Sequence, residues 1–300
     1  MKHKTVNAPP GIAPLAVAGL TVRCGERTLV HDLSFTLAPG ELLGLIGPNG
    51  AGKSTVLKAI AQLMPSRGDI RLHGEDVRRL PARERARRIA YLSQEERLHW
   101  PLTVWDLVAL GRYPHTEGLG TARDTAQRAA VARALHVAEA WDLRSRRVDT
   151  LSGGERARVR LARALAVDAP VLLADEPVAA LDPRQRLRIM ALLRAQCRLG
   201  ISLIVVLHEL TLASQFCDRL LLLEQGAPAA LGRAAEVLTA ALIQKVYGVQ
   251  ALFGEHEGTR YVVPWAVAAC SPRPGVSLAQ ADYKDTDGKP ANAMATSDSS

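Results

Sequence analysis

The stretch from Gly47 to Thr55 carries the residue types that a phosphate site needs. It reads Gly-Pro-Asn-Gly-Ala-Gly-Lys-Ser-Thr and fits the pattern G-x-x-x-x-G-K-[ST] of a loop that wraps the phosphates of a nucleotide. Its glycines let successive backbone N–H groups turn toward an anion, and a following helix adds the positive end of its dipole. Lys53 would reach the β- and γ-phosphates, and the Ser54 hydroxyl would bind Mg²⁺. The expected nucleotide-binding residues are Gly47, Pro48, Asn49, Gly50, Ala51, Gly52, Lys53, Ser54 and Thr55.

Two carboxylates follow a second apolar run, Val171–Ala174. This pattern is typical of a buried parallel strand that ends at an active site. Asp175 would hold Mg²⁺ directly or through water, and Glu176 would polarise the water that attacks the γ-phosphate. The alternative is a surface Asp–Glu pair that caps the turn at Pro177. The phosphate loop in the same chain favours the catalytic interpretation.

Three further groups stand where elements are expected to begin or end. Leu151-Ser-Gly-Gly-Glu155 opens a helix, with Ser152 as N-cap, and makes a second anion-binding terminus. Asp182, before Pro183, begins another helix. His208 follows the β-branched run Ile201–Leu207. A lone histidine is usually a core or surface residue, but its place at the end of a core strand favours a γ-phosphate contact.

The composition favours a folded chain with anionic partners. The 300 residues are 48% hydrophobic, and the net charge of +8 suits a nucleotide or a negatively charged membrane surface. No basic block alternates with stacking aromatics, so we expect no nucleic-acid partner. We find no signal peptide and no apolar run of about 20 residues, so the chain is not expected to cross a membrane by itself. The cysteines form no C-x-x-C pair, which favours a reduced compartment; they are Cys24, Cys197, Cys217 and Cys270.

Alternating and periodic apolar residues predict the elements that position these groups. Two strand-like runs, Leu15–Val22 and Leu29–Leu37, precede the apolar run Glu41–Ile46 that leads into the phosphate loop. A helix is expected over Ser54–Met64, where apolar residues recur at the helical period. A later short strand, Ile89–Ser93, ends at Gln94. Near the C-terminus, a hairpin is expected from Leu220–Leu223 and the Gln225-Gly226 turn, and a helix is expected over Ala234–Val246. The alternation of strands and helices predicts an α/β fold.

The remaining segments are predicted from their composition. Residues 95–165 are rich in helix formers with Gly and Pro breaks, and we expect a helical insertion there, with helices over Val104–Leu110 and Thr121–Trp141. The arginine-rich segment Asp76–Arg88 is interpreted as a solvated helix face rather than a phosphate grip. Residues 1–14 are expected to form a flexible arm. Residues 271–300, rich in Ser, Asp, Ala, Gly and Pro, are expected to form a disordered tail.

With these motifs in order, the chain resembles the ATP-binding subunits of ABC transporters over roughly residues 15–265. Gly47–Thr55 matches the family's Walker A motif, and Val171–Asp175 matches Walker B. The other matches are Gln94 with the Q-loop glutamine, Leu151–Glu155 with the signature motif, Glu176 with the catalytic glutamate, Ala179–Asp182 with the D-loop and His208 with the switch histidine. Glu155 stands where glutamine is commoner.

The resemblance implies an ATPase that uses Mg²⁺ with ATP. Its ABC-type domain would cover residues 15–270, as a P-loop NTPase core with a parallel sheet, an N-terminal antiparallel β-subdomain and the helical insertion. Glu176, His208 and Gln94 would be catalytic. The Mg²⁺ ligands would be Ser54, Gln94 and Asp175. In a head-to-tail homodimer, the ATP on one copy would be contacted by the signature residues of the other, which are Ser152, Gly153, Gly154 and Glu155.

The resemblance also implies membrane partners. The chain would lie peripherally on the cytoplasmic face of the inner membrane, bound to integral-membrane permease subunits and served indirectly by a periplasmic or surface substrate-binding protein. Trp100–Val104 and Leu110–His115 resemble the segment after the Q-loop in importers of ferric siderophores, haem and cobalamin. Leu207–Leu210 and Cys217–Arg219 fit the same group. The expected function is therefore ATP hydrolysis that powers import of such a molecule. His115 is interpreted as a surface loop residue, not as a metal or haem ligand.

Three alternatives stay open. The chain could serve another substrate or a separate-subunit exporter. It could be a soluble ABC-type ATPase acting on nucleic acid, although the stretch between Gly47 and Ser152 shows no sustained heptads and no cysteine cluster. A nucleotide-binding regulator without turnover is a third class, and the presence of Glu176, Gln94 and His208 argues against it.

One position departs from the family pattern. The family usually stacks an aromatic side chain on adenine from the turn after the first strand. That position is Cys24 here, beside Arg23. The departure predicts weaker ATP affinity or relaxed base selectivity, with Arg23 as a replacement through a cation–π contact.

Overall fold

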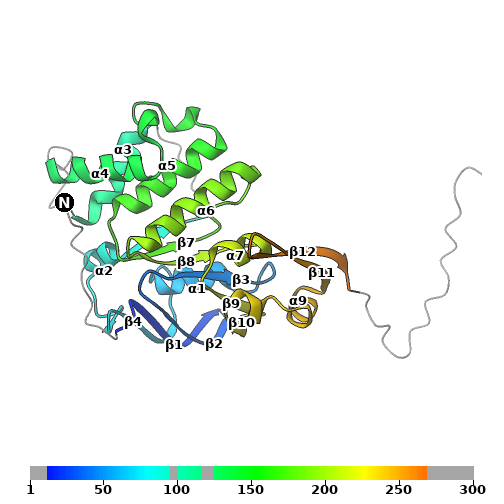
Figure 1. The fold of residues 1–300 in the computed structure, drawn as a ribbon. Coiled ribbons are helices and arrows are strands. Elements are labelled where there is room, and N and C mark those ends of the chain that lie inside the picture. Colours follow the sequence, from blue (N-terminus) through cyan, green and yellow to red (C-terminus); the bar gives the residue numbers. More distant parts are fainter. Residues whose placement is uncertain (1–11, 95–100, 116–124, 269–300) are drawn as a thin grey trace, which may run out of the picture. The chain divides into compact units, whose positions relative to one another are not determined.

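A computed structural model describes residues 12–94, 101–115 and 125–268 of the chain (Figure 1). Most of the expected arm over residues 1–14, the tail over 271–300, Trp100 and the start of the helix expected from Thr121 lie outside the described residues. The arm and the tail therefore stay predictions.

A six-stranded sheet forms the centre of the molecule. Its strands lie in the order β10-β9-β3-β8-β7-β6. All neighbours in it are parallel except β9 and β10, which form the expected hairpin. The inner strands β3, β7 and β8 are buried along their whole length, which explains their continuous apolar runs. The strands are β3 (Leu42–Ile46), β6 (Ile89–Leu92), β7 (Val171–Ala174), β8 (Ser202–Val206), β9 (Arg219–Glu224) and β10 (Ala227–Gly232).

A second, antiparallel sheet comes from the N-terminal part of the chain. Its order is β2-β1-β4-β5. In the second half of β2 the buried residues Leu33, Phe35 and Leu37 alternate with exposed neighbours, the pattern of a sheet with one solvated face. The parallel core and the antiparallel β-subdomain confirm the predicted fold class. The strands are β1 (Leu15–Cys24), β2 (Arg27–Leu37), β4 (Arg67–Leu72) and β5 (Glu75–Asp76).

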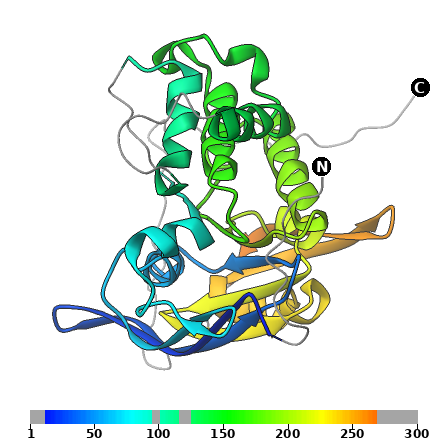
Figure 2. The same ribbon diagram turned by 90° about the vertical axis from the view of Figure 1, so that its left-hand side faces the viewer.

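Both faces of the central sheet are covered by apolar groups. One face shares a core with the antiparallel sheet and with α1 (Lys53–Ile60). The other face shares a core with a layer of helices, and Figures 1 and 2 show α3 to α6 gathered on that side. These helices are α3 (Val104–Ala109), the 3-10 helix η1 (Leu110–His115), α4 (Thr125–Val137), α5 (Gly153–Ala166) and α6 (Pro183–Arg198). Helices therefore occupy the predicted insertion.

The helix after the phosphate loop is shorter than predicted. It ends at Ile60 instead of Met64. Gln62 adopts a left-handed backbone conformation with φ 58°, and the N–H of Leu63 donates back to the carbonyl of Lys58 at 2.8 Å. This hydrogen bond is the usual way to close a helix C-terminus, so apolar periodicity alone overestimated its length.

The C-terminal part contains elements that the sequence did not reveal. The helix expected over residues 234–246 is divided into α8 (Ala234–Val237) and α9 (Ala240–Tyr247), and α7 (Leu210–Phe216) was not expected. A hairpin of β11 (Val249–His256) and β12 (Thr259–Val267) follows. The Thr211 hydroxyl donates to the carbonyl of Val262 and accepts from its N–H, which fixes β12 on α7.

None of the helices among the described residues is both long enough and apolar enough to span a membrane.

Candidate functional site

The phosphate loop is held open by close backbone packing. It connects β3 to α1, and Gly52 at the helix N-cap is left-handed with φ 94°. A Cβ at Gly47 would lie 2.4 Å from the carbonyl oxygen of Leu223, so only glycine fits there. Backbone N–H groups at this helix start are directed at the space where an anion can bind.

Lys53 is the buried cation of this loop. Its side-chain nitrogen donates to the carbonyls of Gly47 at 2.9 Å and Pro48 at 2.8 Å, and the residue is only 5% exposed. Burial lowers the pKa of Lys53, while Glu176 and Asp175 oppose that shift. A buried ammonium held only by neutral carbonyls gains much from an anionic ligand.

Asp175 is anchored on both of its carboxylate oxygens. Oδ1 accepts a hydrogen bond from the Ser54 hydroxyl at 2.8 Å, and Oδ2 accepts one from the Tyr91 hydroxyl at 3.0 Å. The residue is 2% exposed. Burial, and then the charge of Asp175, raise the pKa of Tyr91, so its hydroxyl stays protonated and acts as donor.

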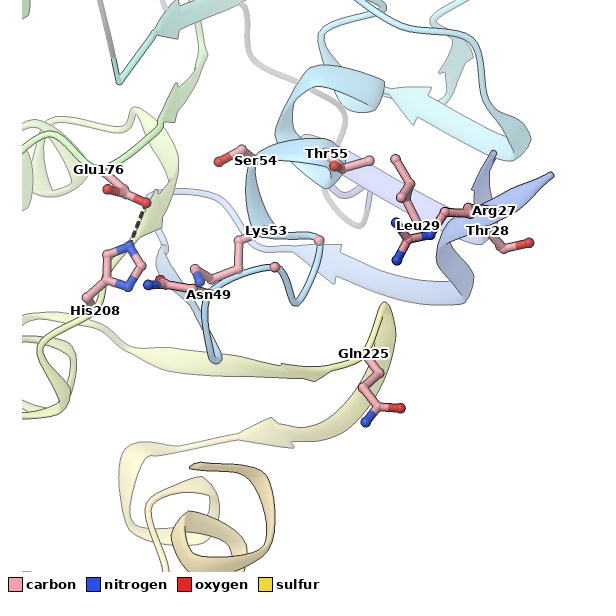
Figure 3. Close-up of a pocket in the computed structure, with 12 residues that line it drawn as sticks. Arg27, Thr28, Leu29, Asn49, Lys53, Ser54, Thr55, Glu176, His208 and Gln225 are labelled. Atoms are coloured by element: carbon pink, nitrogen blue, oxygen red, sulfur yellow. Dashed lines mark hydrogen bonds and ion pairs between the residues drawn. The ribbon is translucent and has the colours of Figure 1, made fainter. Parts of the chain in front are cut away.

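Glu176 gathers the other two residues that were expected to be catalytic. His208 Nε2 lies 2.5 Å from Oε1 of Glu176, and Gln94 Nε2 donates to Oε2 at 2.6 Å. Glu176 has a left-handed backbone with φ 50°, unusual for a residue with a side chain. Such strain is concentrated at functional sites, and here it directs the carboxylate toward His208 (Figure 3).

Lys53, Ser54, Glu176 and His208 line one cavity of about 590 Å³ (Figure 3). Glu176 and His208 lie at one end, and Lys53 lies between them and the far end. Its lining residues are Arg27, Thr28, Leu29, Asn49, Gly50, Gly52, Lys53, Ser54, Thr55, Glu176, His208 and Gln225. A triphosphate on Lys53 would therefore place its terminal phosphate near a carboxylate that can accept a proton.

The far end of the cavity differs from the expectation at Cys24. Arg27, Thr28 and Leu29 line it, and neither Arg23 nor Cys24 does. Cys24 pairs with Arg27 across the β1–β2 turn and is exposed. The guanidinium group that lines this end of the cavity therefore belongs to Arg27 and not to Arg23.

The signature residues lie outside this cavity. Ser152 is the N-cap of α5 and accepts from the N–H of Glu155, while the Glu155 carboxylate accepts from the N–H of Ser152 at 2.8 Å. Glu155 also accepts from Arg146 at 2.9 Å. The acidic residue therefore completes a capping box. Asp182 likewise caps α6 by accepting from the N–H of Gln185 at 2.9 Å.

His115 has more contacts than a surface loop residue. It is partly buried, and its Nε2 lies 2.7 Å from the carbonyl of Val167 at the C-terminus of α5. Arg112, which is 9% exposed, donates to the carbonyls of Ala166 at 2.7 Å and Val167 at 3.3 Å. The segment Leu110–His115 therefore caps the C-terminus of the signature helix.

The donor set at Ser54 and Asp175 fits Mg²⁺. Both side chains offer hard oxygen atoms, which this ion prefers, and few protein ligands suffice when phosphates supply the rest. Gln94 is directed to Glu176 and not to Ser54 or Asp175. Among the described residues, no three His, Cys, Asp or Glu side chains gather as a self-sufficient metal site.

Sequence reasoning missed Tyr91, Arg27 and Gln225. Tyr91 lies three residues before Gln94 on a strand and looks like an ordinary β-strand aromatic. Arg27 begins β2 directly after the turn of one hairpin, and Gln225 lies in the turn of another. Only the tertiary fold brings these two residues to one cavity.

Known proteins are similar to this chain in sequence and in fold. The family model described as ABC transporter matches residues 30–179. The chain belongs to the ABC transporter family. It is an ABC ATPase chain, as its phosphate loop and carboxylates predicted.

Two named relatives are similar to this chain in sequence, and two solved structures are similar to it in fold. The hemin import ATP-binding protein HmuV of Pseudomonas entomophila is 43% identical over 248 residues, which cover 81% of this chain and 95% of the relative. The protein of the same name from Streptomyces coelicolor is 42% identical over 260 residues, covering 86% and 92%. A chain of an inward-facing metal-chelate type ABC transporter has a TM-score of 0.73 at 21% identity and covers 85% of this chain and 97% of its own, which shows the fold. An ATP-binding subunit of an ABC transporter has a TM-score of 0.64 at 27% identity, covering 74% and 91%.

Proposed function

We propose that this chain hydrolyses ATP to drive import of haem, or of a related iron chelate, through a separate membrane permease. The observation that carries the ATPase part is the single cavity shared by Lys53, Ser54 and the Glu176–His208 pair. The relatives named for hemin import, at 43% and 42% identity over most of both chains, support haem over ferric siderophores and cobalamin.

The chain's own residues divide the work of hydrolysis. Lys53 exchanges the carbonyls of Gly47 and Pro48 for phosphate oxygens, which compensates its buried charge. Glu176 accepts the proton of the attacking water. His208 holds Oε1 of Glu176 and contacts the γ-phosphate. Gln94 responds to a bound nucleotide because its side-chain amide donates a hydrogen bond to Glu176, the residue that acts on the γ-phosphate side of the site. Mg²⁺ held by Ser54 and Asp175, with Gln94 as an additional ligand, would neutralise charge on the phosphates.

We further infer a head-to-tail homodimer. Ser152, Gly153, Gly154 and Glu155 form an accessible helix start away from the chain's own cavity, as expected if they complete the ATP site of a second copy. Asp182 begins the neighbouring helix α6 and would lie at the same interface.

The partners and the location follow from this role. The chain would be peripheral on the cytoplasmic face of the cell membrane, bound to integral-membrane permease subunits that receive substrate from a periplasmic or surface binding protein. Residues 15–270 would form the ATP-binding domain.

A membrane preparation tests the proposal. The chain is purified in mild detergent with its co-purifying proteins and reconstituted into vesicles, and ATP-dependent uptake is compared for haem, a ferric siderophore and cobalamin. We expect a polytopic partner and uptake of haem that Glu176→Gln abolishes. Glu257→Gln, in the exposed β11–β12 turn, should transport normally. Recovery of only soluble proteins or nucleic acid would refute transport, and uptake of cobalamin alone would refute the substrate.

A further inference from the structure

We propose that Tyr91 is a positioning residue for the magnesium-binding carboxylate: its hydroxyl holds Oδ2 of Asp175 and thereby fixes Oδ1 toward Ser54. The inference rests on the proposed nucleotide site and adds a residue that no motif of the chain indicates.

The two residues meet because their strands are adjacent. Tyr91 lies on β6, where it pairs with Leu173 of β7. The N–H of Asp175 donates to the carbonyl of Leu92 at 2.8 Å, which continues the strand pairing to the end of β7. The backbone of Asp175 is thus fixed by β6, and its side chain is fixed by a hydroxyl from the same strand.

The hydrogen bond controls an orientation that the backbone leaves open. The terminal torsion of an aspartate is broad, so a carboxylate with one partner can rotate. Ser54 alone would leave Oδ2 of Asp175 in a buried position without a protein donor, and burial makes such a group costly. With Tyr91 on Oδ2, the carboxylate presents one defined oxygen beside the Ser54 hydroxyl.

Groups that hydrogen-bond to metal ligands commonly change metal affinity by about 10- to 100-fold when they are removed. That is the effect expected of losing the Tyr91 hydroxyl. If Tyr91 served in packing alone, losing its hydroxyl would leave metal affinity unchanged. The Tyr91 ring packs against the apolar core on one face of the sheet, and this contact does not need the oxygen.

The test removes the single oxygen atom. Mn²⁺ serves as a paramagnetic probe of the Mg²⁺ site, and its binding to the full-length protein with ATP is titrated by electron paramagnetic resonance. ATP binding in EDTA is measured in parallel by equilibrium dialysis. Tyr91→Phe should weaken Mn²⁺ binding about 10- to 100-fold with ATP affinity in EDTA unchanged. Tyr261→Phe removes the same group from β12 and should change neither.

Each outcome is decisive. Unchanged Mn²⁺ affinity in Tyr91→Phe would overturn the proposal and leave the nucleotide site intact. Equal loss of ATP binding in EDTA would also overturn it, because the hydroxyl would then support the phosphate loop or the fold. Failure of the wild-type protein to bind ATP would refute the proposed function itself.

Discussion

Gln94 donates a hydrogen bond from Nε2 to Oε2 of Glu176 at 2.6 Å, while His208 lies against the other oxygen. Both oxygens of the expected general base are therefore engaged by residues that follow two different strands of the sheet, β6 and β8. Each carboxylate oxygen keeps a second lone pair, so Glu176 can accept a proton from water while both partners stay in place. Because Gln94 holds one of these oxygens, the orientation of the general base depends on the position of Gln94.

Replacing Glu176 by Gln should keep ATP binding and slow hydrolysis by about 10²- to 10⁴-fold, the range for a lost general base. The variant should accumulate as an ATP-bound dimer. Phosphate release and sedimentation velocity measure the two effects. A variant that stays monomeric at saturating ATP would contradict the head-to-tail dimer.

ATP affinity should fall at high pH earlier than an ordinary lysine predicts. Burial lowers the folded-state pKa of Lys53 below 10.5, and only its ammonium form attracts phosphate. Affinity should be full well below that lowered pKa and should decline as the pH rises through it. ATP titrations from pH 7 to pH 10 measure this. Lys58→Met, on an exposed position of α1, should leave the profile unchanged, and Lys53→Ala should abolish binding. A decline that begins no earlier than expected for an exposed lysine would contradict the role of Lys53.

Arg112→Ala should destabilise the fold by about 2–3 kcal/mol, because a buried charged donor to two helix carbonyls is lost. Denaturant unfolding measures the free-energy change. Arg133→Ala, at an exposed position of α4, should change stability by less than about 0.5 kcal/mol. Equal effects of the two substitutions would show that the C-terminus of α5 does not need this cap.

Acid should weaken the start of the signature helix. The backbone N–H of Ser152, and then its side chain and Arg146, lower the pKa of Glu155. A depressed carboxylate pKa gives stability that is present above the ordinary value near 4.5 and is lost as the pH falls through the folded-state pKa. The stability difference between wild type and Glu155→Gln should therefore shrink from pH 7 to pH 3. Glu26→Gln, in the exposed β1–β2 turn, should show no such trend. A difference that does not depend on pH would refute the capping role of the carboxylate.

Arg27→Ala should weaken ATP binding more than Cys24→Ala does, because Arg27 lines the cavity and Cys24 does not. Inorganic tripolyphosphate, which has no base, should bind the Arg27 variant as well as the wild type. Calorimetry distinguishes the two ligands. Tighter ATP binding by Cys24→Tyr would instead show that the base binds beside residue 24, as the sequence suggested.

The motifs that bind phosphate were predictable because each is continuous in the chain and stands at the end of a strand. Gly47–Thr55, Asp175 and Glu176 are of this kind, and the apolar runs before them became β3 and β7. Gln94 and His208 were also identified, but their bonds to Glu176 were not, because side-chain partners depend on how three strands are aligned.

Three other features could not be predicted from the sequence, and the physical reason differs for each. Helix α7 has seven residues, too few to show a reliable period, and its stability comes from contacts with β12. His115 was taken for a surface residue because its partner, the carbonyl of Val167, is distant in sequence. Tyr91 and Arg27 gain their importance only from the arrangement in space.

The turn after β9 determines when, during synthesis, the phosphate loop can reach its final structure. The phosphate loop is complete in sequence by residue 55, yet β3 pairs with β8 and β9, and the N–H of Gly226 donates to the carbonyl of Ala51. The carbonyl of Gly226 in turn accepts from the N–H of His31. A growing chain on the ribosome therefore carries its nucleotide loop without the neighbours that shape it until residue 226 has emerged. ATP can therefore bind the completed loop only after β9 and the turn that follows it have been synthesised.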